Sequence, residues 1–91
     1  MFRFLAEERL EQIGQIRHYY TKIGVAVIDL TAKVAVGDTI RVKGMTSDFR
    51  QKVESMQIEH VNVQNANAGQ SIGLKVMDKV REGDLVYKIL A

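Results

Sequence analysis

The 91-residue sequence contains no cysteine and no proline. Without cysteine there is no disulfide framework, thiolate metal site or cysteine nucleophile, so packing and strand pairing must supply the stability. No apolar run approaches the roughly 18 residues that a membrane span needs, and charges interrupt the N-terminal segment too early for a signal peptide. These absences predict a cytoplasmic protein that does not associate with a membrane.

An excess of charge of one sign is also missing. The 13 Lys and Arg residues face 11 Asp and Glu residues, which leaves a net charge of +2. A total this close to zero predicts no polyanionic partner by itself, so any such partner must be argued from where the charges lie. Length and the absence of a linker-like composition predict a single domain.

Motifs of the common catalytic classes are absent as well. No glycine begins the G-x-x-x-x-G-K-[ST] loop that cradles a nucleotide phosphate. The only imidazoles, His18 and His60, lack the spacing of a metal site, and Ser47, Ser55 and Ser71 lack a G-x-S-x-G context. The sequence therefore predicts no enzyme, no cofactor and no metal, while an active site completed by another subunit stays open.

The N-terminal segment has a helical period. Apolar and acidic residues fall on opposite sides of a 3.6-residue repeat, the apolar side being Phe2, Leu5, Ala6, Leu10 and Ile13 and the acidic side Glu7, Glu8 and Glu11. This predicts a short helix over about Phe4 to Gln12 and divides the chain into a helical extension, 1–12, and a β domain, 13–91. So short a helix does not persist alone, so we expect it to dock as a lid on the β domain or against a second copy.

The rest of the chain has the alternation and turn residues of strands. Gly37-Asp38 and Gly83-Asp84 each precede a β-rich run, where glycine supplies a positive φ and aspartate bonds nearby backbone. A change of inward parity near Glu54-Ser55 predicts a β-bulge. Eight runs of strand residues, some of them joined across a bend or a bulge, are expected to form about six antiparallel strands closed into a barrel: 15–20, 23–30, 40–43, 49–53, 56–58, 61–63, 72–76 and 85–89.

Several motifs resemble the second domain of translational GTPases such as elongation factors Tu and 1-alpha. They are V-x-V-G-D at Val34 to Asp38 and, within Val53 to Asp84, the runs SMQIEH, ANAGQSIGLKV and VREGD. The resemblance covers roughly Ile13 to Ile89 and is strongest to the elongation factor 1-alpha branch and to small stand-alone elongation-factor-like proteins. It implies an all-β fold, a closed six-stranded antiparallel Greek-key-type barrel, without the GTPase domain.

Four cations are expected on one outer face. Alternation directs Arg41 and Lys43 outward from one strand of a hairpin, and Arg50 and Lys52 outward from its other strand. One interpretation is a solvated face with lysines guarding an edge. The other is contact with a phosphate backbone, whose strength would fall steeply with salt. Amide side chains that could assist lie near the next turns: Asn62, Gln64, Asn65, Asn67 and Gln70.

The resemblance also implies three positions of the pocket that holds the aminoacylated end of tRNA in elongation factor Tu. Gln57 stands where that factor has Glu, His60 where it has Arg, and Ser71 where it has Asn. His60 matches the elongation factor 1-alpha pattern. Because all three differ from the bacterial factor, we expect plain surface roles for Gln57 and Ser71.

Two functions are compatible with this sequence. The first is a non-catalytic module for protein biosynthesis that contacts RNA (tRNA or rRNA), a ribonucleoprotein or a translation-related protein through Arg41, Lys43, Arg50 and Lys52, with help from His60. The alternative is a protein-interaction or structural subunit of a larger complex. Because similar barrels are appended to RNA-modifying enzymes of the U32 peptidase-like family, that complex could be an RNA-modifying one.

Overall fold

The structure, a computed structural model, describes residues 8–90, and all its regular elements are strands. The all-β prediction is therefore confirmed. In residues 8–90 there is no helix long and apolar enough to span a membrane, and the cellular location stays a prediction. The strands are β1 Leu10–Tyr20, β2 Val25–Leu30, β3 Val34–Ala35, β4 Thr39–Lys43, β5 Asp48–Lys52, β6 Met56–Ile58, β7 Val61–Val63, β8 Asn65–Ala66, β9 Ser71–Lys75 and β10 Leu85–Ile89.

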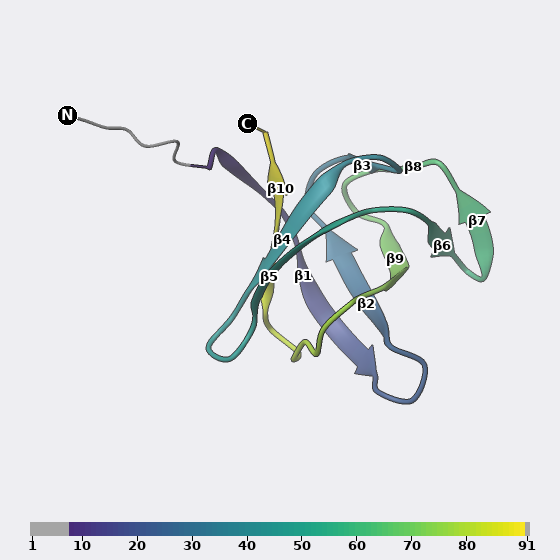
Figure 1. The fold of residues 1–91 in the computed structure, drawn as a ribbon. Helices are drawn as coiled ribbons and strands as arrows, with labels where there is room; N and C mark the ends of the chain where they lie inside the picture. The colour runs from purple at the N-terminus through teal and green to yellow at the C-terminus, as the bar shows by residue number, and fades with distance from the viewer. Residues whose placement is uncertain (1–7, 91) are drawn as a thin grey trace.

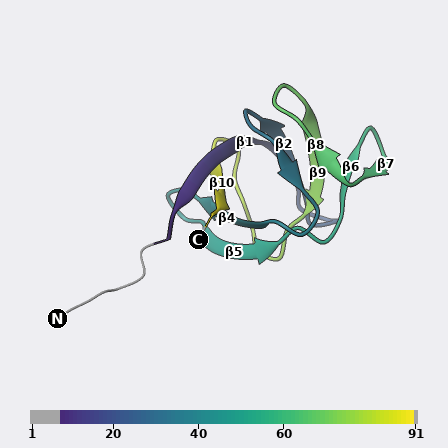
Figure 2. The ribbon, with the colours of Figure 1, turned by 90° about the horizontal axis from the view of Figure 1, so that it is seen from above.

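Eight strands form one sheet in the order β5-β4-β10-β1-β2-β9-β6-β7, and β3 pairs with β8 in a small second sheet. The large sheet curls round a central axis (Figures 1 and 2). It does not close, because β5 and β7 remain its two ends. The prediction of a closed six-stranded barrel is wrong. Strand β6 reaches β9 through a single pair, Gln57 and Gly73, so the β6–β7 hairpin leaves the cylinder instead of completing it.

The predicted N-terminal helix is also wrong over the described residues. Residues 10–12 belong to β1, where Leu10 pairs with Ile89 and Gln12 with Tyr87 of β10, and the Leu90 N–H donates to the Arg9 carbonyl at 2.7 Å. A helix this short is only marginally stable, so pairing with β10 through a ladder of backbone hydrogen bonds stabilises this segment more. The part of the predicted helix before residue 8 lies outside the described residues, and the domain division at residue 12 stays a prediction.

The core lies inside the curl and follows the alternation of the strands. Ile40 and Val42 point inward and are buried, as predicted. Alternation would also direct Val61 inward, but this residue is 62% exposed because β7 lies on the outlying hairpin. The buried apolar residues are Ile13, Ile16, Ala26, Ile28, Leu30, Val34, Ile40, Val42, Val53, Met56, Ala66, Ile72, Leu74, Val76, Val80 and Val86.

Two glycine turns have the predicted form. Gly37 and Gly83 have φ values of 101° and 92°, a region that side-chain-bearing residues rarely adopt. The Asp38 carboxylate accepts a hydrogen bond from the Ala35 N–H at 2.9 Å, and that of Asp84 accepts one from the Arg81 N–H at 3.0 Å. The predicted bulge at residues 54–55 is instead a break between strands, because residues 53–55 belong to neither β5 nor β6.

Close packing joins the β4–β5 hairpin to the segment before β10. Asp84 is buried, and a Cβ atom added to Gly44 would overlap its carboxylate. The Ser47 hydroxyl donates to the Lys79 carbonyl at 3.3 Å. This end of the molecule therefore has no spare space at residue 44.

Candidate functional site

The four predicted cations lie together on the outer face of β4 and β5. Arg41 and Arg50 are direct neighbours across the two strands, and Lys52 lies opposite Thr39 on the same face. Lys43 pairs across the strands with Asp48. The alternation of the sequence therefore predicted this arrangement correctly.

Both arginines already form ion pairs with carboxylates of the same chain. Arg41 donates to both oxygens of Asp48, from Nε at 2.8 Å and from Nη2 at 2.9 Å. Glu8 lies between the guanidinium groups, accepting from Arg41 Nη1 at 3.1 Å and from Arg50 Nη2 at 2.9 Å and Nε. The hydrogen bond from Arg50 holds the pKa of Glu8 below its ordinary value, and that from Arg41 lowers the pKa of Asp48.

The two guanidinium charges are therefore matched by two carboxylates, which weakens the physical ground for binding a polyanion. Glu8 was missed as a partner because the sequence placed it on a helix. His60 does not belong to this group, since it lies in the turn between β6 and β7 on the outlying hairpin.

His60 lines a cleft of about 510 Å³ together with Gln57 and Ser71. The three positions implied by the resemblance are thus brought together, although they differ in chemistry from the pocket of elongation factor Tu. We call this hollow the outer-face cleft. The residues that line it are Tyr20, Ile23, Val25, Val27, Gln57, Glu59, His60, Ser71, Ile72 and Gly73.

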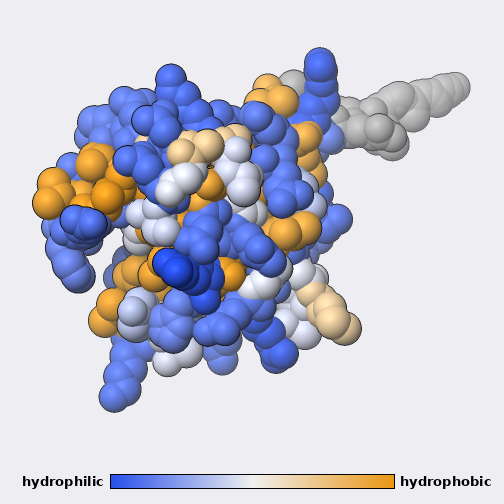
Figure 3. All heavy atoms as spheres, turned by 180° about the vertical axis from the view of Figure 1, so that it is seen from behind, coloured by the Kyte–Doolittle hydropathy of each residue, from blue (hydrophilic) through white to orange (hydrophobic). Residues whose placement is uncertain are grey.

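The floor of the outer-face cleft is apolar and is open because of a glycine. Gly73 pairs with Val27 on one side and Gln57 on the other, and its missing side chain leaves space there. A Cβ at Gly73 would have Val25 Cγ1, at 3.7 Å, as its nearest neighbour. Ile23 on the wall is 60% exposed. Seen from behind, apolar atoms gather on the side that carries β6 and β7, at the left of Figure 3.

The polar rim of the cleft combines bonded and strained residues. The Ser71 hydroxyl donates to Asp29 Oδ1 at 2.6 Å, and Gln57 Nε2 donates to Asn62 Oδ1 at 3.2 Å. Glu59 and His60 form the two-residue turn with φ values of 50° and 67°. Such turns favour Asn-Gly, and larger residues held there are a mark of functional sites.

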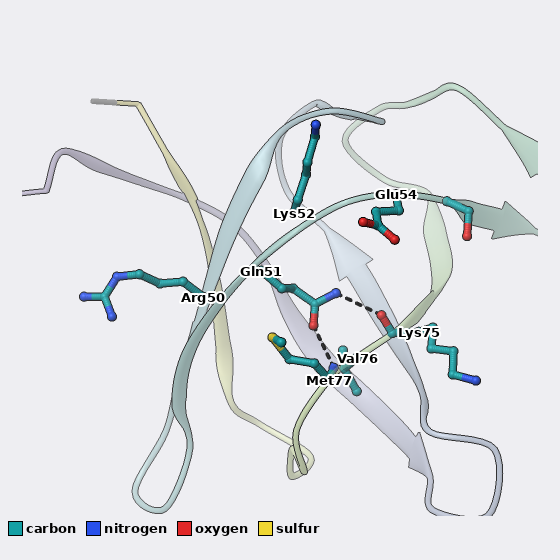
Figure 4. Close-up of a pocket in the computed structure, with 8 residues that line it drawn as sticks. Arg50, Gln51, Lys52, Glu54, Lys75, Val76 and Met77 are labelled. Atoms are coloured by element: carbon teal, nitrogen blue, oxygen red, sulfur yellow. Dashed lines mark hydrogen bonds between the residues drawn. The ribbon is translucent and has the colours of Figure 1, made fainter.

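A second cleft of about 470 Å³ lies where β5 approaches residues 75–77, and we call it the seam. Gln51 spans it: its Nε2 donates to the Lys75 carbonyl at 2.9 Å, and its Oε1 accepts from the Met77 N–H at 2.8 Å (Figure 4). Gln51 was not among the residues predicted from the sequence to form a site. The available signal was a polar residue midway between Phe49 and Val53 on the inward parity of β5.

Within residues 8–90 no group of three or more His, Asp or Glu side chains could hold a metal ion. His18 contacts Glu82 through Nδ1 at 3.1 Å and packs edge-on against Tyr20, so its polar partner lies outside the outer-face cleft. What the outer-face cleft offers is an apolar floor and a polar rim, a combination suited to binding.

No protein-family model matches the sequence. It is 42% identical over 77 residues to an uncharacterized protease of Methanocaldococcus jannaschii, a match that covers 84% of this chain and 19% of that protein. It is 33% identical over 78 residues to a collagenase of Porphyromonas gingivalis, covering 84% of this chain and 22% of the relative. The chain thus spans about a fifth of the length of these relatives.

The fold is similar to that of a domain of known structure. Two crystal structures of the C-terminal domain of a Geobacillus thermoleovorans protein assigned to the U32 peptidases superpose with TM-scores of 0.80 and 0.81. The sequence identities are 20% and 21%, and the superpositions cover 84% and 86% of this chain and 96% and 91% of that domain. At that identity the likeness concerns the fold.

These comparisons correct the first interpretation of the sequence. The relatives are named as proteases and the similar structures come from a U32 peptidase, so the assignment to the second domain of translational GTPases is wrong. The RNA-binding role in protein biosynthesis that depended on it is wrong as well. The alternative, a subunit of a larger and RNA-modifying complex, gains no support from these names.

Proposed function

We propose that this chain is a non-catalytic, polypeptide-binding domain of a U32-type protease, and that the outer-face cleft receives an apolar side chain of the bound polypeptide. The observation that carries the proposal is the hollow above Gly73, floored by Val25 and Val27. The size of this cleft lies in the range of ligand pockets, roughly 300–1,000 Å³.

The comparisons support the protease context in two ways. The chain matches only about a fifth of relatives that are named as proteases, which leaves the larger part of those proteins to carry the chemistry. Its fold also resembles a domain that lies at the C-terminal end of a U32 peptidase. A domain whose described residues hold no group of side chains for a metal ion would then contribute binding.

The shape of the cleft suggests which side chain it would take. Val25 and Val27 offer apolar contact, and the exposed ring of Tyr20 stands at one wall. Aromatic side chains favour such surroundings because they bury a large apolar area and can pack edge-on against another ring. Gln57 and His60 at the rim can hydrogen-bond to the backbone of the bound chain.

Binding of two short peptides tests the proposal. The peptides carry a fluorescent label and differ only in a central Phe or Ser, and their affinities for the purified chain are measured by fluorescence anisotropy. We expect the Phe peptide to bind about tenfold more tightly, because the cleft gains the burial of one aromatic ring. Gly73→Leu, which fills the floor, should remove this preference.

Lys43→Ala is the matched control, because Lys43 lies on the outer face of β4, away from the lining of the cleft. Its binding should equal that of the unaltered chain. Equal affinity for the two peptides, or a Gly73→Leu variant that is correctly folded and still prefers Phe, would refute the proposed site.

A further inference from the structure

The seam brings together two backbone segments that no strand joins. β5 is the last strand at one end of the sheet, and the Lys75 carbonyl and Met77 N–H face it from the other side. The N–H of Val76 points the opposite way and donates to the Gly24 carbonyl at 2.9 Å. Backbone groups that point alternately to two sides are typical of an extended strand, and here the side that faces the seam has no strand partner.

The side chain of Gln51 fills these positions as a piece of backbone would. A carboxamide has one carbonyl and one N–H group to offer, as a peptide group does, and Gln51 uses both, at 2.8 Å to the Met77 N–H and 2.9 Å to the Lys75 carbonyl. The close-up in Figure 4 shows the carboxamide lying across the gap between the two backbones. Gln51 thus replaces a single peptide group of a missing strand.

We propose that the seam binds an extended polypeptide segment by strand addition, with the peptide backbone replacing the Gln51 carboxamide on the Lys75 carbonyl and the Met77 N–H. Main-chain hydrogen bonds supply affinity in this mode of recognition, and alternate side chains supply specificity. The exchange costs little in hydrogen bonding, because each group that Gln51 releases is taken up by an equivalent group of the segment.

The surroundings of the seam specify the chemistry of that segment. Lys52 and Lys75 are exposed beside the seam and Glu54 is the one carboxylate that lines it. Arg50 is already bound by Glu8. On its interior side, the seam is lined by the buried Val76. A strand with acidic residues on its outer side and apolar residues on its inner side complements both surfaces.

This inference does not depend on the function proposed for the outer-face cleft, since the two clefts share no lining residue. A peptide in the seam would be held by its backbone, whereas the outer-face cleft would hold one apolar side chain. The Gly73→Leu variant distinguishes them, because it should abolish the preference for Phe at the outer-face cleft and leave binding at the seam unchanged.

The probe is a labelled acetyl-Glu-Val-Glu-Val-Glu-Val peptide, and its affinity for the purified chain is measured by fluorescence anisotropy. A second peptide has the same side chains but carries N-methyl groups on its valine amides, which removes donors from one edge. We expect the N-methylated peptide to bind at least about tenfold more weakly. In the unaltered chain, hydrogen exchange at the Met77 amide should slow when the first peptide is added.

Variants of the chain test the two other parts of the inference. Gln51→Val removes the group that the peptide must displace, so its affinity for the probe should rise by about threefold. The double substitution Lys52→Glu and Lys75→Glu should weaken binding by about tenfold or more, whereas Lys43→Glu on the same outer face of the sheet should change it by less than about twofold.

Three results would overturn the inference. They are equal affinity for the methylated and unmethylated peptides, no binding of either peptide by the correctly folded chain, and an equal loss of affinity in the Lys43→Glu control. If the Gln51→Val variant does not fold, hydrogen exchange at the Met77 amide still tests the inference, because that measurement is made on the unaltered chain.

Discussion

The outer surfaces of two regions of the sheet, separated by β10 and β1, differ in whether their side chains already have partners. On β4 and β5, charged groups satisfy one another, with Arg41 held between Glu8 and Asp48. On β2 and β9, the valines at positions 25 and 27 lie under open space, because Gly73 contributes no side chain. On the first surface the arginine already has carboxylate partners within the fold. On the second surface the two valines are left uncovered.

The difference shows why a count of charges on one face is a poor guide to a ligand. The sequence placed four cations correctly, but their effective charge depends on carboxylates that arrive from other segments. An apolar hollow has no such internal partner, so it remains available for binding.

Adding the same methyl group to both regions should give very different results. Gly44→Ala would force the buried Asp84 carboxylate aside and disturb its bond to the Arg81 N–H, at a cost of about 3 kcal/mol. Gly73→Ala meets only Val25 Cγ1 at 3.7 Å and should change stability by less than about 0.5 kcal/mol. Denaturant unfolding of both variants measures this, and similar midpoints would mean that the two sites are equally filled.

The turn before β10 should tolerate substitution less well than the charged surface. Gly83 has a φ of 92°, so Gly83→Val should destabilise the chain by about 2 kcal/mol through backbone strain. Gly69→Val, at a φ of 90°, should behave alike. Lys43→Ala should stay within about 0.5 kcal/mol. Thermal melts decide the matter, and equal melting temperatures for the three variants would contradict the prediction.

Relieving the strained turn at the rim of the outer-face cleft should stabilise the chain. The double substitution Glu59→Asn and His60→Gly installs residues that adopt positive φ readily, and we expect a gain of about 1 kcal/mol. If the turn serves binding, affinity for the Phe peptide should fall while the melting temperature rises. A double variant that is no more stable would show that the positive φ values of 50° and 67° carry little strain.

The carboxylates on β4 and β5 should make stability depend weakly on pH. Hydrogen bonds from Arg50 and Arg41 lower the pKa values of Glu8 and Asp48 below the ordinary 4.5 and 3.8. The unfolded chain therefore binds these protons more readily, so the contribution is present above the ordinary values and is lost as pH falls through the lower folded ones.

Glu8→Gln should accordingly flatten the fall of the melting temperature below about pH 5. Glu54→Gln is the control, because Glu54 lines the seam and forms no ion pair within residues 8–90. Melting curves recorded at a series of pH values measure both variants. Parallel profiles for the unaltered chain and Glu8→Gln would show that the Glu8 pairs contribute nothing to acid stability.

Local features of the fold were predictable from the sequence. The inward and outward residues of β4 follow from strict alternation, and the turns at Gly37 and Gly83 follow from glycine and aspartate chemistry. The strand prediction over 15–20 is confirmed within β1, but the first part of that strand, residues 10–12, was not predictable in this way. Its residues have a helical period, and its pairing partner, β10, lies at the other end of the chain.

Closure of the sheet depends on a detail that alternation alone does not determine. Residues 53–55 separate β5 from β6, and β6 pairs with β9 only through Gln57 and Gly73. The clefts that this opening leaves had weak signals in the sequence. Gly73 between two apolar residues marks a strand position without a side chain, and Gln51 is a polar residue at an inward position.

The pairing of Leu10 with Ile89 has a mechanical consequence. Antiparallel neighbours β1 and β10 bring both ends of the described chain to one corner (Figure 1). Tension applied to the two ends would therefore load the outermost hydrogen bond, from the Leu90 N–H to the Arg9 carbonyl, and then each following rung in turn. We expect the domain to unzip under small forces instead of resisting shear along the whole strand.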